Sequence, residues 1–532
     1  STNGGLIVPN QFFIKNSKQQ ASFNAYKFNT KRIVSTIFMI GTSWKNQLFL
    51  DITGRNDWSS ALVYSYGTGN FSYFYPSVSG SWIITETFKD KLPKWVSFAK
   101  VRGSWAQVGN DTSPYYINSG YSVATYQRGD KKIYGMTIPE NMKSTNLKPE
   151  RKNAWEVGLD WRFLDSRIGV DLTYYKENTR NQIMTINVPW ESGVKEKLIN
   201  AGNIQNSGIE IALNTTPIKK KQWQWDLNFT YTRNRNKIVE LSPDVTSYIN
   251  LDGAANYGNY RIASVAKVGS DYGMLMSDSW IKTDEKTGKP VVGYTNKFRT
   301  VYYKRGGTVK EVGSMLPNFL GSLNSTLRWK DLSLYVLFDA RFGGYVASYN
   351  SRYATAYGFS GETEKYRKGM TWTSKYANAQ DKVFTDGFIP DVVFDAGTIV
   401  TTPGGTNQDV SGMTYQEAYE KGYVEPAHLQ SAAYFKNSWG TGVINDDWFK
   451  KINYIALREI TLSYNVPTKI SSYIGAKNLS LSFTGRNLAY LLNTAPNHEN
   501  PESVRGTGAA QFRMRSFMPY TASYLFTLNA TF

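Results

Sequence analysis

The sequence contains no cysteine and only two histidines, His428 and His498. The absence of cysteine excludes disulfide bonds, thiolate nucleophiles and cysteine metal sites. No serine or aspartate stands near either histidine at a recognisable catalytic spacing, and glycine patterns that cradle phosphates are absent. The stretch 283–289 (TDEKTGK) lacks the residue order of a calcium-binding EF-hand loop and is interpreted as a charged hairpin tip. We therefore expect no enzyme activity, no cofactor and no metal site.

Long apolar runs are also missing. No window approaches 18 consecutive apolar residues, so no transmembrane helix is predicted. Residues 1–5 have neither the basic start nor the apolar run of a signal peptide, and the chain does not begin with methionine. These features indicate a processed or partial product.

Long windows rich in Ala, Leu, Glu and Lys are scarce, whereas Tyr (37), Phe (27), Trp (15) and Gly (44) are abundant. For 532 residues this composition favours one very large β-sheet structure. The net charge is +19, but the basic residues are scattered along the chain and do not gather in one arm or stripe. That distribution argues against nucleic-acid binding and fits partners rich in negative charge, such as lipopolysaccharide.

Alternation of apolar and polar residues is the dominant pattern. In the last stretch, 524–532 (YLFTLNATF), the aromatic and aliphatic residues share one parity and the threonines and asparagine occupy the other, with Leu525 as the mismatch. A single strand of this kind also fits a soluble β-sandwich. The choice of fold class therefore depends on whether the alternating pattern recurs along the chain. About fifteen strands of this kind are predicted, at 32–42, 47–56, 76–84, 98–108, 155–163, 168–175, 209–213, 225–231, 260–268, 272–281, 319–329, 332–342, 460–464, 479–483 and 524–532.

The predicted connections fall into two alternating classes. Short ones lie at 43–46, 85–94, 164–166, 216–221, 269–271, 330–331 and 467–478. Long ones lie at 57–73, 109–152, 189–206, 235–259, 283–316, 348–450 and 491–521. Short turns at one end and long loops at the other are typical of a transmembrane antiparallel β-barrel in the outer membrane of a diderm bacterium. On this reading residues 1–30 belong to an extracellular loop and 31–532 to a barrel portion.

The alternation also assigns side chains to faces. The polar residues at every second position of the strands are predicted to face a water-filled lumen. They include Glu156, Asp160, Arg162, Asp339 and Arg341. Aromatic residues in or beside the long loops are candidates for stacking on sugar rings or clamping a peptide, and these are Trp190, Trp280, Tyr353, Trp372, Tyr415 and Trp439. Aromatic girdles and loop packing explain such residues equally well, so substrate contact is expected of only a minority.

Several stretches carry a family resemblance. They are LFLDITGRNDWSS (48–60), FYPSVSGSW (74–82), AKVRGSWAQVGN (99–110), NLKPERKNAWEVGLDWRFLDSRIGVDLTYYKENT (146–179), NAGNIQNSGIEIAL (200–213), PNFLGSLNSTLRWKDLSLYVLF (317–338), YIALREITLSYNVP (454–467), LSFTGRNL (481–488) and the terminal strand. In this order and spacing the chain resembles the carboxy-terminal half of the SusC/RagA-type TonB-dependent transporters of Bacteroidetes. The stretches GRNDWSS and ENPES (499–503) depart from the family pattern in loop details.

The resemblance implies a plugged barrel of 22 strands. Bacterial barrels have an even number of strands, so fifteen strands entered from a loop do not make a complete barrel. Open edges in lipid are prohibitively costly, so we expect the plug, the TonB-contacting segment and the first seven strands to lie in a separate piece. The resemblance also implies a SusD-like lipoprotein lid and, at Phe532, an aromatic assembly signal.

The function expected from this resemblance is TonB-dependent import of a nutrient, either an oligosaccharide or an oligopeptide. A passive porin and a surface adhesin barrel are the alternatives, and the sequence leaves the choice of substrate open.

Overall fold

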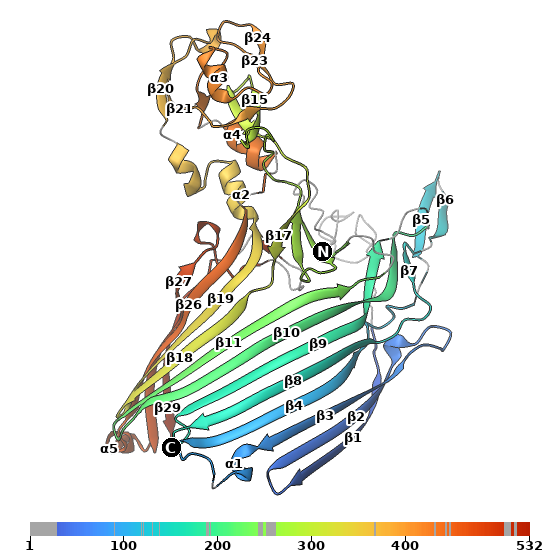
Figure 1. The fold of residues 1–532 in the computed structure, drawn as a ribbon, viewed down its shortest axis with the longest axis vertical. Helices are drawn as coiled ribbons and strands as arrows, with labels where there is room; N and C mark the ends of the chain where they lie inside the picture. Colours follow the sequence, from blue (N-terminus) through green and yellow to red (C-terminus); the bar gives the residue numbers. More distant parts are fainter. Residues whose placement is uncertain are drawn as a thin grey trace, which may run out of the picture.

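The computed structural model describes residues 29–504, apart from gaps at 90, 119, 121, 130, 138, 188–190, 192, 243–247, 252–261, 367–368, 430–431, 442–443 and 446–447, together with 512–514 and 519–532. Its main feature is a large curved antiparallel sheet from which the long loops project at one end (Figure 1). The predicted loop position of residues 1–30 falls almost entirely outside the described residues.

Thirteen strands form the continuous path of this sheet, which we call the wall sheet. They are β1 (Ile33–Trp44), β2 (Leu48–Ser59), β3 (Ser72–Ile83), β4 (Val96–Asn110), β8 (Glu150–Phe163), β9 (Ile168–Asn187), β10 (Glu196–Lys219), β11 (Trp223–Glu240), β18 (Phe319–Trp329), β19 (Leu332–Ser348), β26 (Phe449–Val466), β27 (Asn478–Asn493) and β29 (Ser523–Thr531). Each pairs antiparallel with the next wall strand along the chain, so the wall is an up-and-down meander. Two short strands join it in parallel pairing, β7 (Asn141–Lys143) on β10 and β28 (Arg513–Met514) on β19.

Tight turns set the register at the end of the wall that we call the short-turn end. The Lys45 and Asn46 backbones are left-handed, with φ of 50° and 54°, as the turn between β1 and β2 requires. Lys330, with φ of 51°, serves the same purpose between β18 and β19. Longer connections leave the opposite end, so the two classes of connection predicted from sequence are segregated in space (Figure 1).

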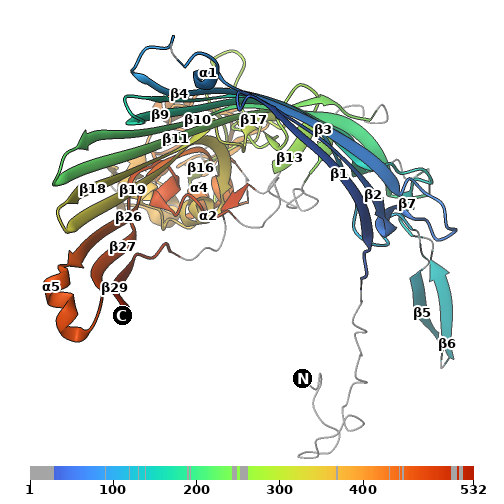
Figure 2. The ribbon, with the colours of Figure 1, turned by 90° about the horizontal axis from the view of Figure 1, so that it is seen from below.

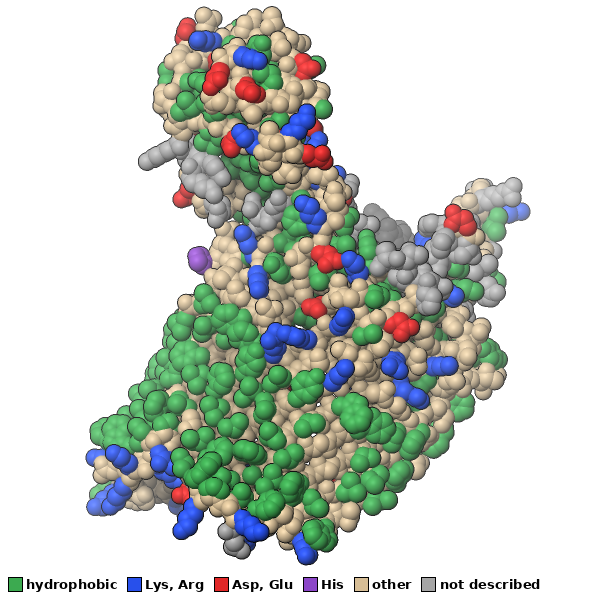
Figure 3. Space-filling model, in the orientation of Figure 1, with side chains coloured by type: hydrophobic (Ala, Val, Ile, Leu, Met, Phe, Trp, Pro, Cys, Tyr) green, Lys and Arg blue, Asp and Glu red, His purple; other side chains and the backbone are tan. Residues whose placement is uncertain are grey.

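The wall sheet is apolar on its convex face and polar on its concave face. On β8 the side chains of Trp155, Val157 and Trp161 are exposed on the convex face, where Figure 3 shows a broad band of apolar side chains. Figure 2, seen from the short-turn end, shows the wall as a curved arch. Because side chains alternate across a strand, Glu156 and Asp160 face that concave side. The sheet does not close, and β1 and β29 are its two edges.

Aromatic rings gather on the strands close to the short turns. Trp223 and Trp329 stack at 5.6 Å, and Trp95 stacks on Phe163 at 5.6 Å. Trp82 contacts Phe88 at 6.0 Å. Such a row, next to an apolar band, is the girdle expected at a membrane–water interface.

Two loop excursions form additional structure at the other end. The connection from β11 to β18 contains β12 (Tyr248–Asn250), β13 (Ile262–Lys267), β14 (Met274–Ser277), β15 (Val291–Thr295), β16 (Thr300–Tyr303) and β17 (Lys310–Ser314). The connection from β19 to β26 contains β20 (Met370–Thr373), β21 (Val383–Phe388), β22 (Val393–Phe394), β23 (Ile399–Thr401), β24 (Asn407–Asp409), β25 (Ala427–His428), α2 (Tyr349–Ala356), α3 (Tyr415–Glu420) and α4 (Ala432–Phe435).

The remaining elements are short. The connection from β4 to β8 carries the hairpin β5 (Ser122–Arg128) and β6 (Lys131–Thr137). Helices α1 (Ile84–Thr87) and α5 (Thr468–Ser471) lie at the short-turn end (Figure 1). Single turns of 3-10 or π helix occur at Ser60–Leu62, Gly361–Tyr366, Ala377–Ala379, Lys436–Gly440, Ser472–Ile474 and Pro496–His498. Within the described ranges no helix has both the length and the apolar character needed to cross a membrane.

The structure confirms a sheet of fifteen strands but corrects its membership. The two weaker candidates, 260–268 and 272–281, contribute β13 and β14 to a separate four-stranded sheet, β12-β13-β14-β17. The predicted loops 235–259 and 283–316 are therefore parts of one excursion between β11 and β18. The predicted loop 189–206 is largely β10, because the wall strands run on past the short apolar stretch that revealed them.

Candidate functional site

The concave face of the wall carries a charged network centred on Arg102 of β4. Its guanidinium donates to both carboxylate oxygens of Asp171 on β9, at 3.0 and 3.1 Å, and to the Thr173 hydroxyl at 2.6 Å. Glu156 of β8 lies 3.6 Å from the same guanidinium. Arg102 pairs directly with Gly158 of β8, and Gly158 pairs with Thr173 of β9. Because Gly158 has no side chain, the guanidinium can cross β8 and reach Asp171 and Thr173 on the same face of the sheet. Arg102 and Glu156 border a groove of about 250 Å³ whose lining also includes Asp51 and Lys100.

The other predicted concave-face residues have partners within the chain. Arg162 lies 3.5 Å from Asp160 two residues earlier on β8. Asp339 of β19 accepts from Arg458 of β26 at 2.8 Å, and Arg458 also donates to Glu502 at 2.7 Å. Arg341 donates to the carbonyl oxygens of residues 343 and 315, at 3.3 and 3.2 Å.

Arg458 therefore connects the wall to the 494–522 connection. Tyr490 of β27 donates to the Glu502 carboxylate at 2.7 Å and reinforces that link. The Glu499 carboxylate accepts hydrogen bonds from the hydroxyls of Ser348 at 2.8 Å and Ser351 at 3.2 Å. Burial raises the pKa of this carboxyl. The carboxylates of Glu499 and Glu502 thus tie residues 499–502 to β19, α2 and β26.

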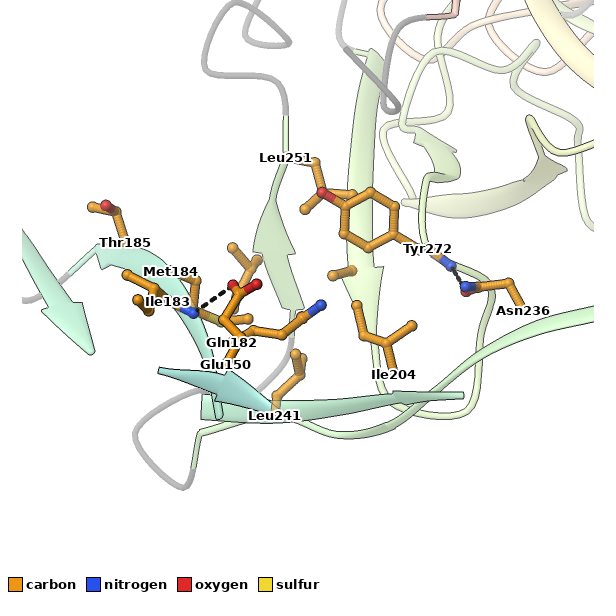
Figure 4. Close-up of a pocket in the computed structure, with 12 residues that line it drawn as sticks. Glu150, Gln182, Ile183, Met184, Thr185, Ile204, Asn236, Leu241, Leu251 and Tyr272 are labelled. Carbon is orange, nitrogen blue, oxygen red and sulfur yellow. Dashed lines mark hydrogen bonds between the residues drawn. The ribbon is translucent and has the colours of Figure 1, made fainter. Parts of the chain in front are cut away.

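A cavity of about 500 Å³ opens at the long-loop end of the wall (Figure 4). The ends of β9, β10 and β11 form one side, and the four-stranded sheet forms the other. Its lining combines aliphatic and polar side chains, namely Glu150, Gln182, Ile183, Met184, Thr185, Ile204, Asn236, Leu241, Ile249, Leu251, Ala266 and Tyr272. This volume lies within the range of pockets that bind small organic ligands.

Hydrogen bonds fix the polar groups of this cavity. The Glu150 carboxylate accepts from the Ile183 backbone N–H at 3.0 Å and from the Asn110 side chain at 3.0 Å. The Asn236 side-chain oxygen accepts from the Tyr272 backbone N–H at 2.8 Å. Ile204 and Leu241 are buried in the apolar cluster that forms the floor. The cavity therefore pairs an apolar floor with fixed polar groups at its rim.

Beyond the cavity, segments 281–305 and 349–448 assemble into one body, which we call the loop module. An antiparallel bridge between Ile281 and Arg305 closes its base, and β15 from the first segment pairs in parallel with β22 from the second. Its core includes Val292, Phe394 and Tyr415. Figure 1 shows the module projecting away from the wall.

Two of the aromatic residues predicted as substrate contacts are buried in this core. Tyr415 is 0% exposed and donates its hydroxyl proton to the Glu425 carbonyl oxygen at 2.8 Å. Trp439 is 6% exposed and packs edge-on against Tyr303. The structure gives both a packing role, because the module needs large apolar side chains to form a core of its own.

The other predicted aromatics are partly accessible. Trp372 stacks on Phe384 at 5.1 Å and donates its indole N–H to Glu425 at 3.2 Å. Trp280 donates to the Ser277 carbonyl oxygen at 2.8 Å. Tyr353 stacks on Tyr357 at 6.5 Å. Trp190 lies outside the described residues, and substrate contact by any of these side chains stays a prediction.

Burial also changes the acidity of phenols in the loop module. The pKa values of Tyr294 and Tyr415 are well above the ordinary value of 10, and that of Tyr376 is also raised, in each case chiefly because burial disfavours the charged phenolate. These three side chains are therefore neutral at physiological pH.

Sequence reasoning did not single out Arg102, Arg458 or Glu502, although they centre the charged networks. The alternation along β4 could have identified Arg102, because it places this residue on the same polar face as Lys100. No comparable signal exists for Glu502, because it lies in a connection and reaches Arg458 only through the fold.

Comparison with known proteins agrees with this architecture. Residues 14–345 match the family model described as TonB dependent receptor-like, beta-barrel. The chain is 23% identical to TonB-dependent receptor P26 of Formosa agariphila over 486 residues, which is 89% of this chain and 43% of that relative. It is 28% identical to TonB-dependent receptor SusC of Bacteroides thetaiotaomicron over 270 residues, 49% of this chain and 26% of that relative. The chain thus spans less than half the length of these relatives.

The fold is also found among solved structures. The RagAB peptide transporter superposes with a TM-score of 0.65 and 16% identity, over 97% of this chain and 50% of that one. The resemblance to SusC/RagA-type proteins that the sequence predicts is confirmed, as is an outer-membrane location. The family consists of transporters and not enzymes, as expected. The chain belongs to the TonB-dependent receptor-like β-barrel family.

Proposed function

We propose that this chain forms part of the wall of a TonB-dependent importer, which takes up an oligopeptide or an oligosaccharide with a SusD-like lipoprotein. The observation that carries the proposal is the opposite polarity of the two faces of the wall. An apolar convex face suits lipid, and a concave face bearing the Arg102 network suits water and a polar cargo.

The open edges support a larger barrel. Strands β1 and β29 each leave one edge of the wall without a partner among the described residues. Unpaired backbone groups in lipid are costly, so further strands pair there, and a 22-stranded barrel with an amino-terminal plug meets that need. TonB acts on this proposed transporter through the plug piece.

The long loops are the proposed extracellular side. The cavity beside β9, β10 and β11 opens there, and the loop module stands next to it. A surface lipoprotein closing over this end would enclose a cargo between itself and the cavity. The apolar floor and the polar rim of the cavity suit both amphipathic peptides and sugars, so both classes of substrate remain in the proposal.

Uptake assays separate this proposal from its rivals. Cells carrying the transporter are given mixed oligopeptides or oligosaccharides, with and without functional TonB. Import is expected to stop without TonB. Import that continues would favour a passive porin, and surface adhesion without any import would favour an adhesin barrel.

Co-purification from native membranes tests the partners and the cargo. We expect a lipoprotein, a plug-bearing piece and a bound substrate identifiable by mass. The cavity is then tested with Leu251→Trp, which fills it, against Leu251→Ala, which enlarges it. Loss of bound substrate in the first variant alone is expected, and equal retention in both would move the binding site elsewhere.

A further inference from the structure

Two neighbouring turns at the short-turn end form a basic cluster. Lys219 is the last residue of β10, and Lys220 and Lys221 lie in the turn that leads to β11. The turn between β18 and β19 begins at Lys330. The Lys330 backbone N–H donates to the Gln222 carbonyl oxygen at 3.0 Å, so the two turns lie side by side. All four lysine side chains are exposed.

An aromatic pair lies on the convex face beside these turns. Lys220 and Trp223 exchange both backbone hydrogen bonds and therefore share that face, whereas Lys219 pairs with Gln224 and points to the concave face. The rings of Trp223 and Trp329 stack at 5.6 Å with an interplanar angle of 25°. The Lys330 ammonium lies 5.4 Å from the centre of the Trp329 ring. Tryptophan pairs at the edge of an apolar band mark the depth of lipid headgroups, which sets the ammonium groups of the two turns at that depth.

The positive charge of the cluster is not neutralised locally. Arg328 is ion-paired with Asp226 at 2.6 Å, whereas the four ammonium groups have no carboxylate within ion-pair distance among the described residues. Asp331, in the second turn, is the one acidic residue within the two turns. Figure 3 shows Lys and Arg side chains along the lower edge of the apolar band.

From these observations we infer that Lys220, Lys221 and Lys330 bind the phosphodiester headgroup of an anionic phospholipid in the leaflet at the short-turn end. The ammonium groups neutralise the phosphate, and the Trp223–Trp329 pair packs against the glycerol and upper acyl chains. Charge complementarity selects this occupant, because clustered lysines at the membrane surface attract anionic lipids and an apolar band continues directly above them.

The test is native mass spectrometry of the transporter, purified from native membranes and exchanged into micelles that contain equal amounts of phosphatidylglycerol and phosphatidylcholine. The wild-type protein is expected to retain phosphatidylglycerol preferentially. The variant Lys220→Gln/Lys221→Gln/Lys330→Gln is expected to lose about tenfold of that preference, a conservative figure for three surface lysines. Equal retention of the two lipids by the wild-type protein would overturn the proposal.

A matched variant removes the same charge elsewhere. Lys286→Gln/Lys297→Gln/Lys382→Gln alters three exposed lysines of the loop module and is expected to keep the wild-type preference. An equal loss in both variants would show a general charge effect and contradict a site at the turns. If the first variant does not assemble, the pair Lys220→Gln/Lys330→Gln is compared with Lys220→Arg/Lys330→Arg, and only the former is expected to lose the preference.

Competition with inorganic phosphate distinguishes a lipid site from a free-anion site. Added phosphate is expected to leave bound phosphatidylglycerol unchanged, because the lipid is also held by its apolar part against the tryptophan pair. Complete displacement by inorganic phosphate would assign the cluster to free anions and refute lipid binding.

Discussion

The wall sheet and the loop module place their apolar side chains in opposite ways. On the wall, Trp155 is 62% exposed and Phe229 is 41% exposed, and both lie on the convex face. In the module, Phe394 is 1% exposed within a closed core. One chain therefore builds two regions for two solvents, because a broad band of exposed apolar side chains is favourable against lipid, whereas in water such side chains gain most when they are buried in a core.

The largest expected effect comes from the module core. Phe394→Ala is expected to cost about 3–5 kcal/mol, because it removes a buried ring and leaves a cavity. Limited proteolysis should then cleave within 349–448 while the wall stays protected. Phe359→Ala is the matched control, since this side chain is 84% exposed. If both variants were equally resistant, the module would not depend on its own core.

The convex face of the wall gives the next effect. Phe229→Arg is expected to cost about 2–4 kcal/mol if the side chain lies near the middle of the bilayer. Urea titration of the folded transporter in liposomes measures this cost. Thr230→Arg, one residue on and on the concave face, should cost much less. Equal costs at the two positions would contradict the assignment of faces.

The concave network offers a smaller effect. Arg102→Ala is expected to cost about 1 kcal/mol, since it leaves Asp171 and Glu156 without their partner, but these groups are partly exposed to water. The same urea titration measures it. Arg162→Ala is the control and should cost less, because Arg162 has a single, longer ion pair. A larger cost for the control would show that the network does not centre on Arg102.

The smallest effect at neutral pH concerns the buried phenols of the module. An unfolded tyrosine ionises near pH 10, whereas Tyr294 and Tyr415 hold their protons to higher pH when folded. The unfolded state therefore gains stability as the pH rises above 10, and the module is expected to loosen there. Tyrosinate absorbance and proteolysis, followed together, should change in one step.

Tyr415→Phe is the control for this alkaline transition. It removes one ionisable phenol and the hydrogen bond to the Glu425 carbonyl oxygen. The variant should be less stable at pH 7 and show a weaker pH dependence above 10. An unchanged pH dependence would mean that Tyr415 is not the group that titrates.

What the sequence by itself determined is local. The thirteen wall strands, their faces and their short turns follow from alternation over a few residues, because the period of a strand is fixed by its backbone. The hairpin of 155–163 and 168–175 is present as β8 and β9, paired from Phe163 and Ile168 onward. The family resemblance followed from the same stretches.

Only the tertiary structure decided how distant segments combine. Strands β13 and β14 alternate much as wall strands do, yet they join a separate sheet. Their apolar side chains are buried in clusters with residues at the long-loop ends of wall strands, such as Ile204 and Phe449, and do not face lipid. Segments 281–305 and 349–448 share one core, which buries Tyr415 and Trp439. Likewise Arg458 reaches Glu502 across 44 positions. Such contacts depend on long-range packing, which no local pattern of residues encodes.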